Sequence, residues 1–370
     1  MVIIIKVLFL LVFLIAQGYS DPLFSKYQLF KDGRFPGLAI TNEGTVLAFW
    51  GDEQLQVKRS IDGGKTFGNE IIIAKKGING GGAIVDRKSG KILAFSQSEH
   101  PPSDSFIHES NDDGLTWKTS KFKIVNEDKG MKTQLHFSDS GIDLETKKCQ
   151  GRIIRPARVY GTQDGYNNAI YSDDGSQWFV SNEFPIKATG EGAIVEFQDG
   201  TLLYSSRRHW FPSKEALSPY RIFSKSYDCG ETWQDPYESI GLYDGPRYRS
   251  MTEGKGPSHQ GHYGLMGSMV KLDTESEFVL LHSSVFDEEY NWLRKGLVIY
   301  ISMDGGISWE KSDPLHDGPA AYSAILVIKN SEDVYKSDII IFFEGGLDKE
   351  YEGGYLITTT LDNLFPSINE

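Results

Sequence analysis

The chain has 370 residues, with 51 acidic and 38 basic side chains, and its formal net charge is −13. This acidity argues against nucleic acid or an anionic membrane as the main partner, because either would require clustered Lys and Arg. Two cysteines exclude a disulfide-built scaffold and a four-cysteine zinc site. The 39 glycines and the 12% aromatic content predict a large, turn-rich β protein and argue against disorder.

Residues 1–20 have the pattern of a secretory signal peptide. Lys6 precedes an unbroken apolar run from Val7 to Ala16, and small and polar residues follow up to Ser20. The run is shorter than the roughly 20 apolar residues that a membrane span requires, so an uncleaved anchor is the second interpretation. No later segment is apolar enough to span. We therefore expect a secreted or lumenal protein whose mature chain starts near Asp21.

A turn motif recurs along the chain. The pattern Ser-x-Asp-x-Gly-x-x-aromatic occurs four times, and a fifth copy is one residue shorter. Asp and Ser side chains bond to nearby backbone N–H groups and hold tight turns, and Gly supplies the positive φ that such a turn needs. The aromatic ring is expected to fill the space beneath the turn. The four full copies begin at Ser60, Ser110, Ser226 and Ser302, and the shorter copy begins at Ser172.

Short strand-like runs surround these turns. Each alternates or is apolar over about five residues and ends at Gly, Asp or Asn. No segment has a helical period longer than two or three turns. Many short strands with one turn signature per unit predict an all-β protein, specifically a β-propeller. The runs are residues 44–49, 91–96, 193–197, 201–205, 297–302 and 338–343.

With these turns, which are Asp boxes, the chain resembles the sialidase (neuraminidase) superfamily of Asp-box, or BNR-repeat, propellers. The resemblance covers nearly the whole mature chain and implies one six-bladed β-propeller domain over residues 21–370. We expect the Asp-box aspartates to stabilise turns on the blade rim. Asp-box propellers also include non-catalytic proteins and other glycosidases, so the function must be predicted from other residues.

Sialic acids carry a carboxylate on the anomeric carbon, and this determines what a site for them needs. Guanidinium groups suit bidentate recognition of that carboxylate. A carboxylate nucleophile would be repelled by it, and sialidases use a tyrosine instead. The resemblance therefore implies three arginines, a tyrosine activated by a glutamate, and a separate acid.

Two of the arginines are Arg34 and Arg294. Arg34 lies in Gly33-Arg34-Phe35-Pro36, which is similar to the family's Arg-Ile-Pro motif with Phe in place of Ile. A surface arginine before a turn is the other reading of this triplet. Arg294 begins the run that leads into the last Asp box, where the family commonly has an arginine. Lys295 would be a poor substitute because it has no planar fork.

The third arginine closes a predicted hairpin that opens with Glu191, turns at Asp199-Gly200 and ends with Arg207. This stretch is similar to the family's hairpin. Alternation across the hairpin can bring Glu191 and Arg207 to the same end, facing one cavity. The resemblance makes Glu191 the base that activates the tyrosine. We expect Glu196 to face outward and Arg208 to point away from Arg207.

The nucleophile that the resemblance implies is Tyr322. It lies in Gly318-Pro-Ala-Ala-Tyr322-Ser323, which closely matches the family's nucleophile segment. Glu344, in Phe342-Phe-Glu344-Gly-Gly346, resembles the glutamate that holds the first arginine of the family's triad. Glu344 is therefore expected to orient Arg34.

The acid is expected in the short loop Phe49–Gln54, before the first Asp box. Asp52 is the first choice and Glu53 the second. Many relatives carry an additional sugar-contacting arginine in this loop, where this chain has Trp50 or nothing.

Together these residues predict a retaining exo-α-sialidase acting on sialylated glycans or glycoproteins, with no cofactor and no nucleic acid partner. The alternatives are a catalytically silent sialic-acid-binding propeller, a hydrolase of a deaminated sialic acid, and a trans-sialidase. His259 and His262 have the spacing of a ligand pair, but no further ligand accompanies them, and a solvated loop is the preferred interpretation. The sequence leaves open whether Cys149 and Cys229 pair, and it leaves the oligomeric state open.

Overall fold

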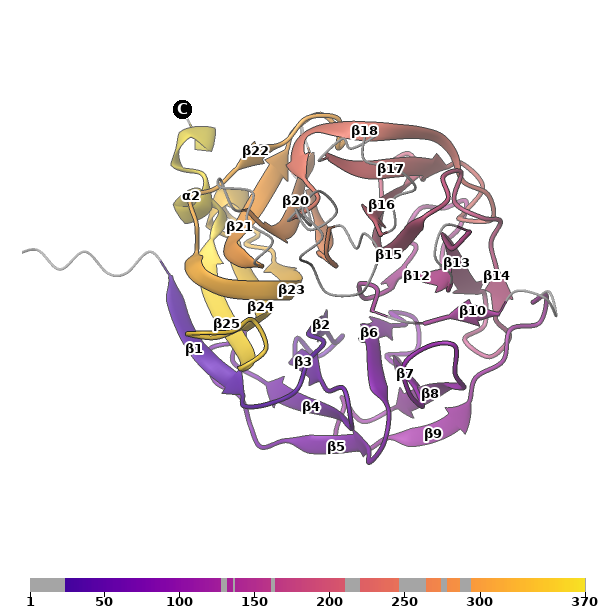
Figure 1. The fold of residues 1–370 in the computed structure, drawn as a ribbon. Coiled ribbons are helices and arrows are strands. Elements are labelled where there is room, and N and C mark those ends of the chain that lie inside the picture. The colour runs from indigo at the N-terminus through magenta and orange to yellow at the C-terminus, as the bar shows by residue number, and fades with distance from the viewer. Residues whose placement is uncertain are drawn as a thin grey trace, which may run out of the picture.

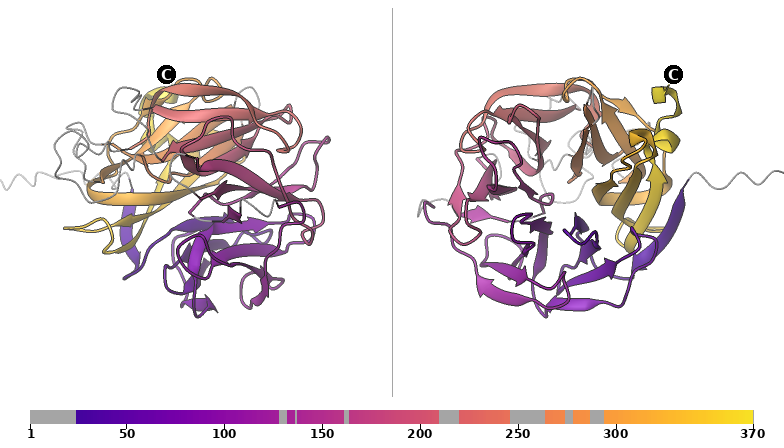
Figure 2. Two further views of the ribbon diagram at one scale, coloured as in Figure 1. Left: turned by 45° about the vertical axis from the view of Figure 1, so that its right-hand side comes forward. Right: turned by 180° about the vertical axis from the view of Figure 1, so that it is seen from behind.

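The computed structural model describes residues 24–127, 132–135, 137–160, 164–209, 220–245, 264–273, 278–286 and 294–369. The predicted signal peptide, His259 and His262 lie outside these residues. Nearly all regular structure is antiparallel β-sheet, and the strand groups are arranged around a common axis (Figures 1 and 2). Among the described residues, no helix is long and apolar enough to cross a membrane.

The first half of the chain forms three sheets in sequence order. The first sheet contains β2 (Gly37–Ile40), β3 (Val46–Trp50), β4 (Leu55–Ser60) and β5 (Ile71–Ala74). The second contains β6 (Ile78–Val85), β7 (Ile92–Gln97), β8 (Ser105–Ser110) and β9 (Lys118–Lys121). The third contains β10 (Thr133–Gln134), β11 (Ile142–Asp143), β12 (Ile153–Val159), β13 (Tyr166–Ser172) and β14 (Phe179–Val180).

The second half forms a four-stranded and an eight-stranded sheet, with short helices near the end of the chain. The four-stranded sheet contains β15 (Thr189–Glu196), β16 (Leu202–Arg208), β17 (Tyr220–Ser226) and β18 (Gln234–Tyr243). The larger sheet contains β19 (Met269–Asp273), β20 (Phe278–Val285), β21 (Lys295–Ser302), β22 (Glu310–Lys311), β23 (His316–Ile328), β24 (Asp338–Gly345), β25 (Gly353–Thr360) and β1 (Ser25–Phe30). The helices are η1 (Val334–Lys336), α2 (Leu361–Leu364) and η2 (Pro366–Asn369).

Two pairings explain how the ring is built. The first residues of β23 pair with β21, at Pro319 with Lys295, and the rest of β23 pairs with β24. Dividing the eight-stranded sheet between β21 and β23 gives two groups of four strands, which makes six strand groups among the described residues. β1 pairs with β25 in antiparallel orientation, so the first and last strands of the described chain belong to the same group and close the ring (Figure 1). The β-propeller predicted from the sequence is confirmed.

The Asp boxes form the predicted turns. In the first copy, Ser60 Oγ accepts from Gly64 N at 2.8 Å, and Asp62 Oδ1 accepts from Thr66 N at 2.9 Å. The same bonds recur in the other full copies, for example from Gly306 N to Ser302 Oγ at 2.9 Å. Each turn therefore satisfies its own backbone through neighbours only a few residues away.

The two cysteines, whose pairing the sequence left open, form a disulfide. Cys149 and Cys229 are 80 residues apart in sequence, and their Cα atoms are 5.7 Å apart. The bond joins the turn after β11 to the Asp box after β17. It therefore links the third sheet to the four-stranded sheet that follows.

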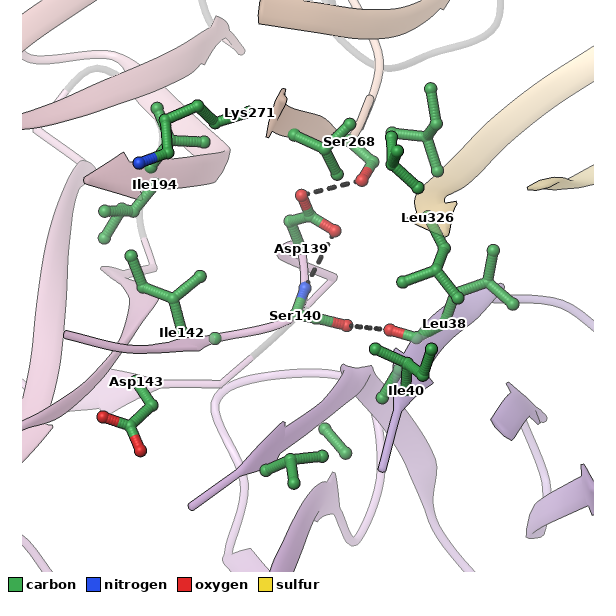
Figure 3. Close-up of a pocket in the computed structure, with 18 of the residues that line it drawn as sticks. Leu38, Ile40, Asp139, Ser140, Ile142, Asp143, Ile194, Ser268, Lys271 and Leu326 are labelled. Atoms are coloured by element: carbon green, nitrogen blue, oxygen red, sulfur yellow. Dashed lines mark hydrogen bonds between the residues drawn. The ribbon is translucent and has the colours of Figure 1, made fainter. Parts of the chain in front are cut away.

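A segment of three residues, Ser138–Ser140, bonds to several strand groups of the ring, and we call it the axial segment. Its bonds reach three strand groups: Ser140 Oγ donates to Leu38 O at 2.7 Å, and Asp139 Oδ2 accepts from Ser268 Oγ at 2.8 Å (Figure 3). Asp139 N donates to Gly192 O at 2.9 Å. The axial segment thus ties the inner strands together.

Beside the axial segment lies a cavity of about 410 Å³, bordered by the inner strands of several groups. Figure 3 shows Asp139 in its midst among aliphatic side chains. The cavity is bordered by residues 194–196 of β15 and 325–327 of β23, whereas the candidate site described next lies on earlier residues of these strands. Its aliphatic lining includes Leu38, Ile40, Ile142, Ile194 and Leu326.

Candidate functional site

The centre of the site is a direct contact between Tyr322 of β23 and Glu191 of β15. The Tyr322 hydroxyl donates a hydrogen bond of 2.7 Å to Glu191 Oε1. The two residues are 131 positions apart, and only 6% of Tyr322 and 1% of Glu191 is exposed. The structure therefore brings together the two residues that the sequence analysis paired.

Glu191 reaches this position from an irregularity in β15. The ladder between β15 and β16 skips Glu191 between Gly190 and Gly192, which makes it the extra residue of a β-bulge. Its φ is 54°, which is uncommon for a residue with a Cβ. The backbone is held on both sides: Arg221 Nη2 donates to Glu191 O at 3.3 Å, and Asp139 N donates to Gly192 O. The bulge aims the carboxylate inward instead of along the regular pleat.

Arg207 lies beside this pair on β16. Its Nη1 donates to Glu191 Oε2 and, at 3.0 Å, to the Tyr322 oxygen. Burial raises the pKa of Glu191, but the charges of Arg207 and Arg158 outweigh it, and the pKa ends below its ordinary value. Burial and the charge of Glu191 raise the pKa of Tyr322 above its ordinary value, against the opposing effect of the arginines. In the free protein the proton therefore resides on Tyr322 and the negative charge on Glu191.

Arg34 and Glu344 form a two-pronged ion pair, as the sequence analysis expected. Arg34 Nε donates to Glu344 Oε1 and Nη2 to Oε2, both at 3.0 Å. Glu344 is fully buried on β24, whereas 27% of the Arg34 side chain is exposed. Glu344 also accepts from Phe35 N at 3.0 Å and Tyr322 N at 3.2 Å. The same carboxylate thus fixes the guanidinium of Arg34 and the backbone of Tyr322.

Arg294 approaches from the start of β21. Its Cζ lies 5.2 Å from the centre of the Tyr322 ring, and the Cζ of Arg34 lies 5.3 Å from the same ring. Tyr351, in the connection between β24 and β25, joins the two arginines. Its hydroxyl accepts from Arg294 Nη1 at 3.0 Å, and its ring lies 4.0 Å from Arg34 Cζ. With Arg207, three guanidinium groups therefore surround Tyr322.

Two phenylalanines form a wall next to Tyr322. The rings of Phe35 and Phe137 stack with their centres 3.6 Å apart, and both lie about 6 Å from the Tyr322 ring. Their φ values are 70° and 47°. Side chains with a Cβ rarely adopt such angles, and strained backbone of this kind is often found at functional sites.

Asp52, the expected acid, lies apart from this cluster. Within the described residues, no hydrogen bond or ion pair joins Asp52 or Glu53 to Tyr322 or to the residues bonded to it. Both border a separate cavity of about 420 Å³, next to residues 31–33. Asp52 Oδ1 is close to Gly33, the residue before Arg34: a Cβ on Gly33 would lie 3.5 Å from it. The acid candidates are thus adjacent to the Arg34 turn but are not in the hydrogen-bonded cluster.

Of the two alternatives for the place of the sugar-contacting arginine, Trp50 or nothing, the structure excludes Trp50. The ring is fully buried and stacks on Phe30 with ring centres 5.8 Å apart. Its Nε1 donates to Asp32 O at 2.8 Å. Trp50 packs inside the protein because both its ring and its N–H have partners there.

The structure tests two further expectations about the Glu191–Arg207 hairpin. Arg208 points away from Arg207 as expected, and it pairs with Glu238 of β18. The outward orientation expected for Glu196 is wrong. The residue is 6% exposed, and its carboxylate accepts from the backbone N–H groups of Glu145 and Thr146, at 2.6 and 3.1 Å. A loop from the neighbouring sheet covers it.

Sequence reasoning missed Arg158, Tyr351 and Phe137. Arg158 Nη1 lies 3.8 Å from Glu191 Oε1, and the side chain is completely buried on β12. A signal was present, because Arg155 and Arg158 interrupt an apolar strand, and buried charges require partners. Tyr351 and Phe137 lie in irregular connections, where no pattern in the sequence indicates that they reach the site.

The described residues include no group of three or more His, Cys, Asp or Glu side chains that could hold a metal ion. His259 and His262 lie outside the described residues.

Known proteins share sequence and fold with this chain. The family model of the BNR repeat-like domain matches residues 50–335. A sialidase of Micromonospora viridifaciens is 25% identical over 256 residues, which are 58% of this chain and 39% of that protein. A sialidase of Paraclostridium sordellii is 30% identical over 165 residues, or 42% of this chain and 36% of that protein. The chain thus spans about two fifths of the length of these curated relatives.

Solved structures show the same fold. The sialidase of Trypanosoma rangeli superposes with a TM-score of 0.68 at 16% identity, over 95% of this chain and 61% of that one. The intramolecular trans-sialidase of Ruminococcus gnavus superposes with a TM-score of 0.65 at 15% identity, over 90% of this chain and 95% of that one.

Proposed function

Because the chain belongs to the sialidase/BNR-repeat superfamily, we propose that it is a glycoside hydrolase, an exo-α-sialidase that releases terminal α-linked sialic acids with retention of configuration. One observation carries the proposal: a buried tyrosine hydroxyl bonded to a glutamate, with three arginines around it. A neutral nucleophile amid positive charge suits a substrate whose reacting carbon carries a carboxylate.

Substrate binding is assigned to Arg34, Arg207 and Arg294. The planar guanidinium group binds a carboxylate with two parallel hydrogen bonds. Glu344 holds Arg34 in advance, so little ordering of that side chain is needed when the substrate arrives. The Arg34 side chain is partly exposed, which leaves it accessible to a ligand.

The chemical step follows from the Tyr322–Glu191 bond. The Tyr322 oxygen attacks the anomeric carbon while its proton passes along the 2.7 Å bond to Glu191, and the bond to the leaving oxygen breaks. The developing phenolate is unfavourable at its raised pKa, and Arg207, which donates to the same oxygen, stabilises it.

The proposed acid is Asp52, with Glu53 as the alternative. It gives a proton to the leaving oxygen and later takes one from the water that hydrolyses the glycosyl-tyrosine. Its position next to the Arg34 turn supports this assignment. In D52N and E53Q variants, the true acid is identified by loss of turnover on a substrate with a poor leaving group, together with rescue on one with a good leaving group.

The test of the function is release of methylumbelliferone from its α-sialoside between pH 4 and pH 8. We expect turnover by the natural chain and loss of turnover in E191Q. Absence of turnover by folded protein at every pH would contradict the hydrolase proposal.

A catalytically silent sialic-acid-binding propeller is the second candidate, supported by the separation of Asp52 from the Tyr322 cluster. Calorimetry with free sialic acid, combined with the hydrolysis assay, distinguishes the two: a lectin binds and does not hydrolyse. A hydrolase of a deaminated sialic acid and a trans-sialidase keep the same site. Product analysis with both sugars and with lactose as acceptor separates them.

We further propose that residues 1–20 are removed on export and that residues 21–370 act as one secreted or lumenal domain on sialylated glycans. The Cys149–Cys229 disulfide supports an oxidising compartment. Mass spectrometry of the exported protein tests the cleavage near Asp21.

A further inference from the structure

Arg158 is a fourth arginine at the site, and its environment is unusual. The side chain is 0% exposed, and a buried guanidinium is costly unless it is well paired. Its Nη2 contacts His209 Nδ1 at 2.9 Å, and its Cζ lies 4.9 Å from the Tyr160 ring. Nε and Nη1 have no hydrogen-bond acceptor among the described residues. The closest negative charge is Glu191 Oε1, 3.8 Å from Nη1.

The local backbone is built around this guanidinium. Gly190 precedes Glu191, and a Cβ at this position would lie 2.7 Å from Arg158 Cζ, so any other residue here would displace the guanidinium. His209 must accept the bond from Arg158, because a guanidinium has no acceptor, so its Nδ1 carries no proton. Gly190 therefore leaves space for Arg158 beside Glu191, and the neutral His209 accepts one of its hydrogen bonds.

Arg158 and Arg207 approach opposite oxygens of the same carboxylate. Arg207 bonds to Oε2, while Arg158 faces Oε1, which also accepts the Tyr322 hydroxyl. Under the proposed function, Arg207 must also bind the substrate carboxylate, which draws its charge away from Glu191. Arg158 is too deeply buried to follow, so it is the cation that stays with Glu191 during the reaction.

We propose that Arg158 is a positioning residue that keeps the buried Glu191 ionised, and therefore able to accept the proton of Tyr322, while Arg207 is engaged with substrate. The inference rests on the proposed function for the role of Glu191, whereas the contacts themselves do not depend on it. Arg158 acts through Glu191 and is not assigned to bind the sugar.

The other groups around Glu191 must be counted before a pH dependence is assigned. Without Arg158, burial would dominate, and the pKa of Glu191 would rise. Arg207 remains as an opposing cation in the free protein, so the rise is partial. By element, the titratable and charged groups are Arg158 and Tyr160 at β12, Arg207 and His209 at β16, Arg221 on β17 with Asp244, and Tyr322 on β23 with Arg34 and Arg294 beyond it.

The direct test is carboxyl-carbon NMR of protein labelled in its glutamates, with the Glu191 signal assigned by its absence in E191Q. We expect the Glu191 titration midpoint to rise by about one pH unit in R158M and by less in R158K. R152M is the matched control, because Arg152 precedes the same strand but pairs at the surface with Asp173. An unchanged midpoint in R158M would overturn the inference. If R158M does not fold, R158Q takes its place, because it also removes the positive charge, and an unchanged midpoint there would overturn the inference as well.

Activity supplies a second readout. The acid limb of the kcat–pH profile should shift to higher pH in R158M, as the Glu191 midpoint does. R152M should keep the profile of the natural chain. A uniform loss of kcat at every pH would indicate a merely structural role and contradict the inference. If the natural chain hydrolyses no sialoside, the proposed function fails, whereas the NMR titration still decides the role of Arg158.

Discussion

In both the Asp-box turns and the axial segment an aspartate accepts several hydrogen bonds, but the pKa is lowered in the turn and raised in the axial segment. Asp62 accepts hydrogen bonds from Thr66 N, Thr66 Oγ1 and Ser60 Oγ, and these bonds hold its pKa far below the ordinary value. Asp139 also accepts three bonds, yet burial raises its pKa to about 6. The difference is water: the rim carboxylate keeps its solvation and the axial one loses it.

Glu191 is a third case, which shows what a buried carboxylate needs to stay charged. It is as buried as Asp139, but its pKa lies below the ordinary value because Arg207 and Arg158 outweigh the burial. At Asp139, hydrogen bonds from neutral donors and the charge of Arg155 do not outweigh burial. The site thus differs from the axial segment in having two arginines close to one carboxylate, and the variants predicted below test either the site or the Asp-box and axial aspartates.

The largest effect is expected for Tyr322→Phe, which removes the group that Glu191 serves. We expect kcat to fall by at least about 1,000-fold, because the nucleophile is lost, while sialic acid still binds through the arginines. The measurements are steady-state hydrolysis and calorimetry. Y335F is the control, since Tyr335 lies on η1, after the end of β23, and is not one of the residues bonded to Tyr322 or Glu191. Full activity in Y322F would refute the nucleophile assignment.

Glu344→Gln should have the second largest effect. It removes the charge that pairs with Arg34, and breaking one side of such a pair costs about 3 kcal/mol. We expect a higher KM with a smaller change in kcat, because Arg34 loses its fixed orientation, and a lower melting temperature. E310Q, on the exposed strand β22, should change neither quantity. An unaltered KM in E344Q would separate Glu344 from substrate binding.

Whether a feature could be predicted from the sequence depends on how many residues separate its contacting partners along the chain. The Asp boxes close within a few residues, and the Glu191–Arg207 hairpin closes within 16, so both could be predicted. The Arg34–Glu344 pair spans 310 residues and was expected only through family resemblance. The positions of Trp50, Arg158 and Tyr351 depend on packing between distant segments, which no local pattern specifies.

Asp139→Asn tests the axial side of the contrast. In the native chain the folded pKa of about 6 exceeds the unfolded value of about 4, so the folded state binds the extra proton between these values. This contribution to the free energy of unfolding is complete below about pH 4 and is lost as the pH rises through about 6, by up to about 3 kcal/mol. Denaturation at several pH values should therefore show D139N gaining on the native chain as the pH rises. A constant difference would contradict the raised pKa.

Asp304→Ala, in the last Asp box, should have the smallest effect. Asp304 accepts from Ser308 N at 2.9 Å and from Ser302 Oγ at 2.8 Å, and its loss should cost about 1 kcal/mol of stability, because water replaces bonds at an exposed turn. Turnover should not change, since the box lies at the opposite end of β21 from Arg294. The control is D313A, whose side chain makes no hydrogen bond within the described residues. The pair is compared by thermal melting and by hydrolysis. A loss of activity in D304A without loss of stability would mean that the rim turns act on the site, and the separation between turn and site would then have to be abandoned.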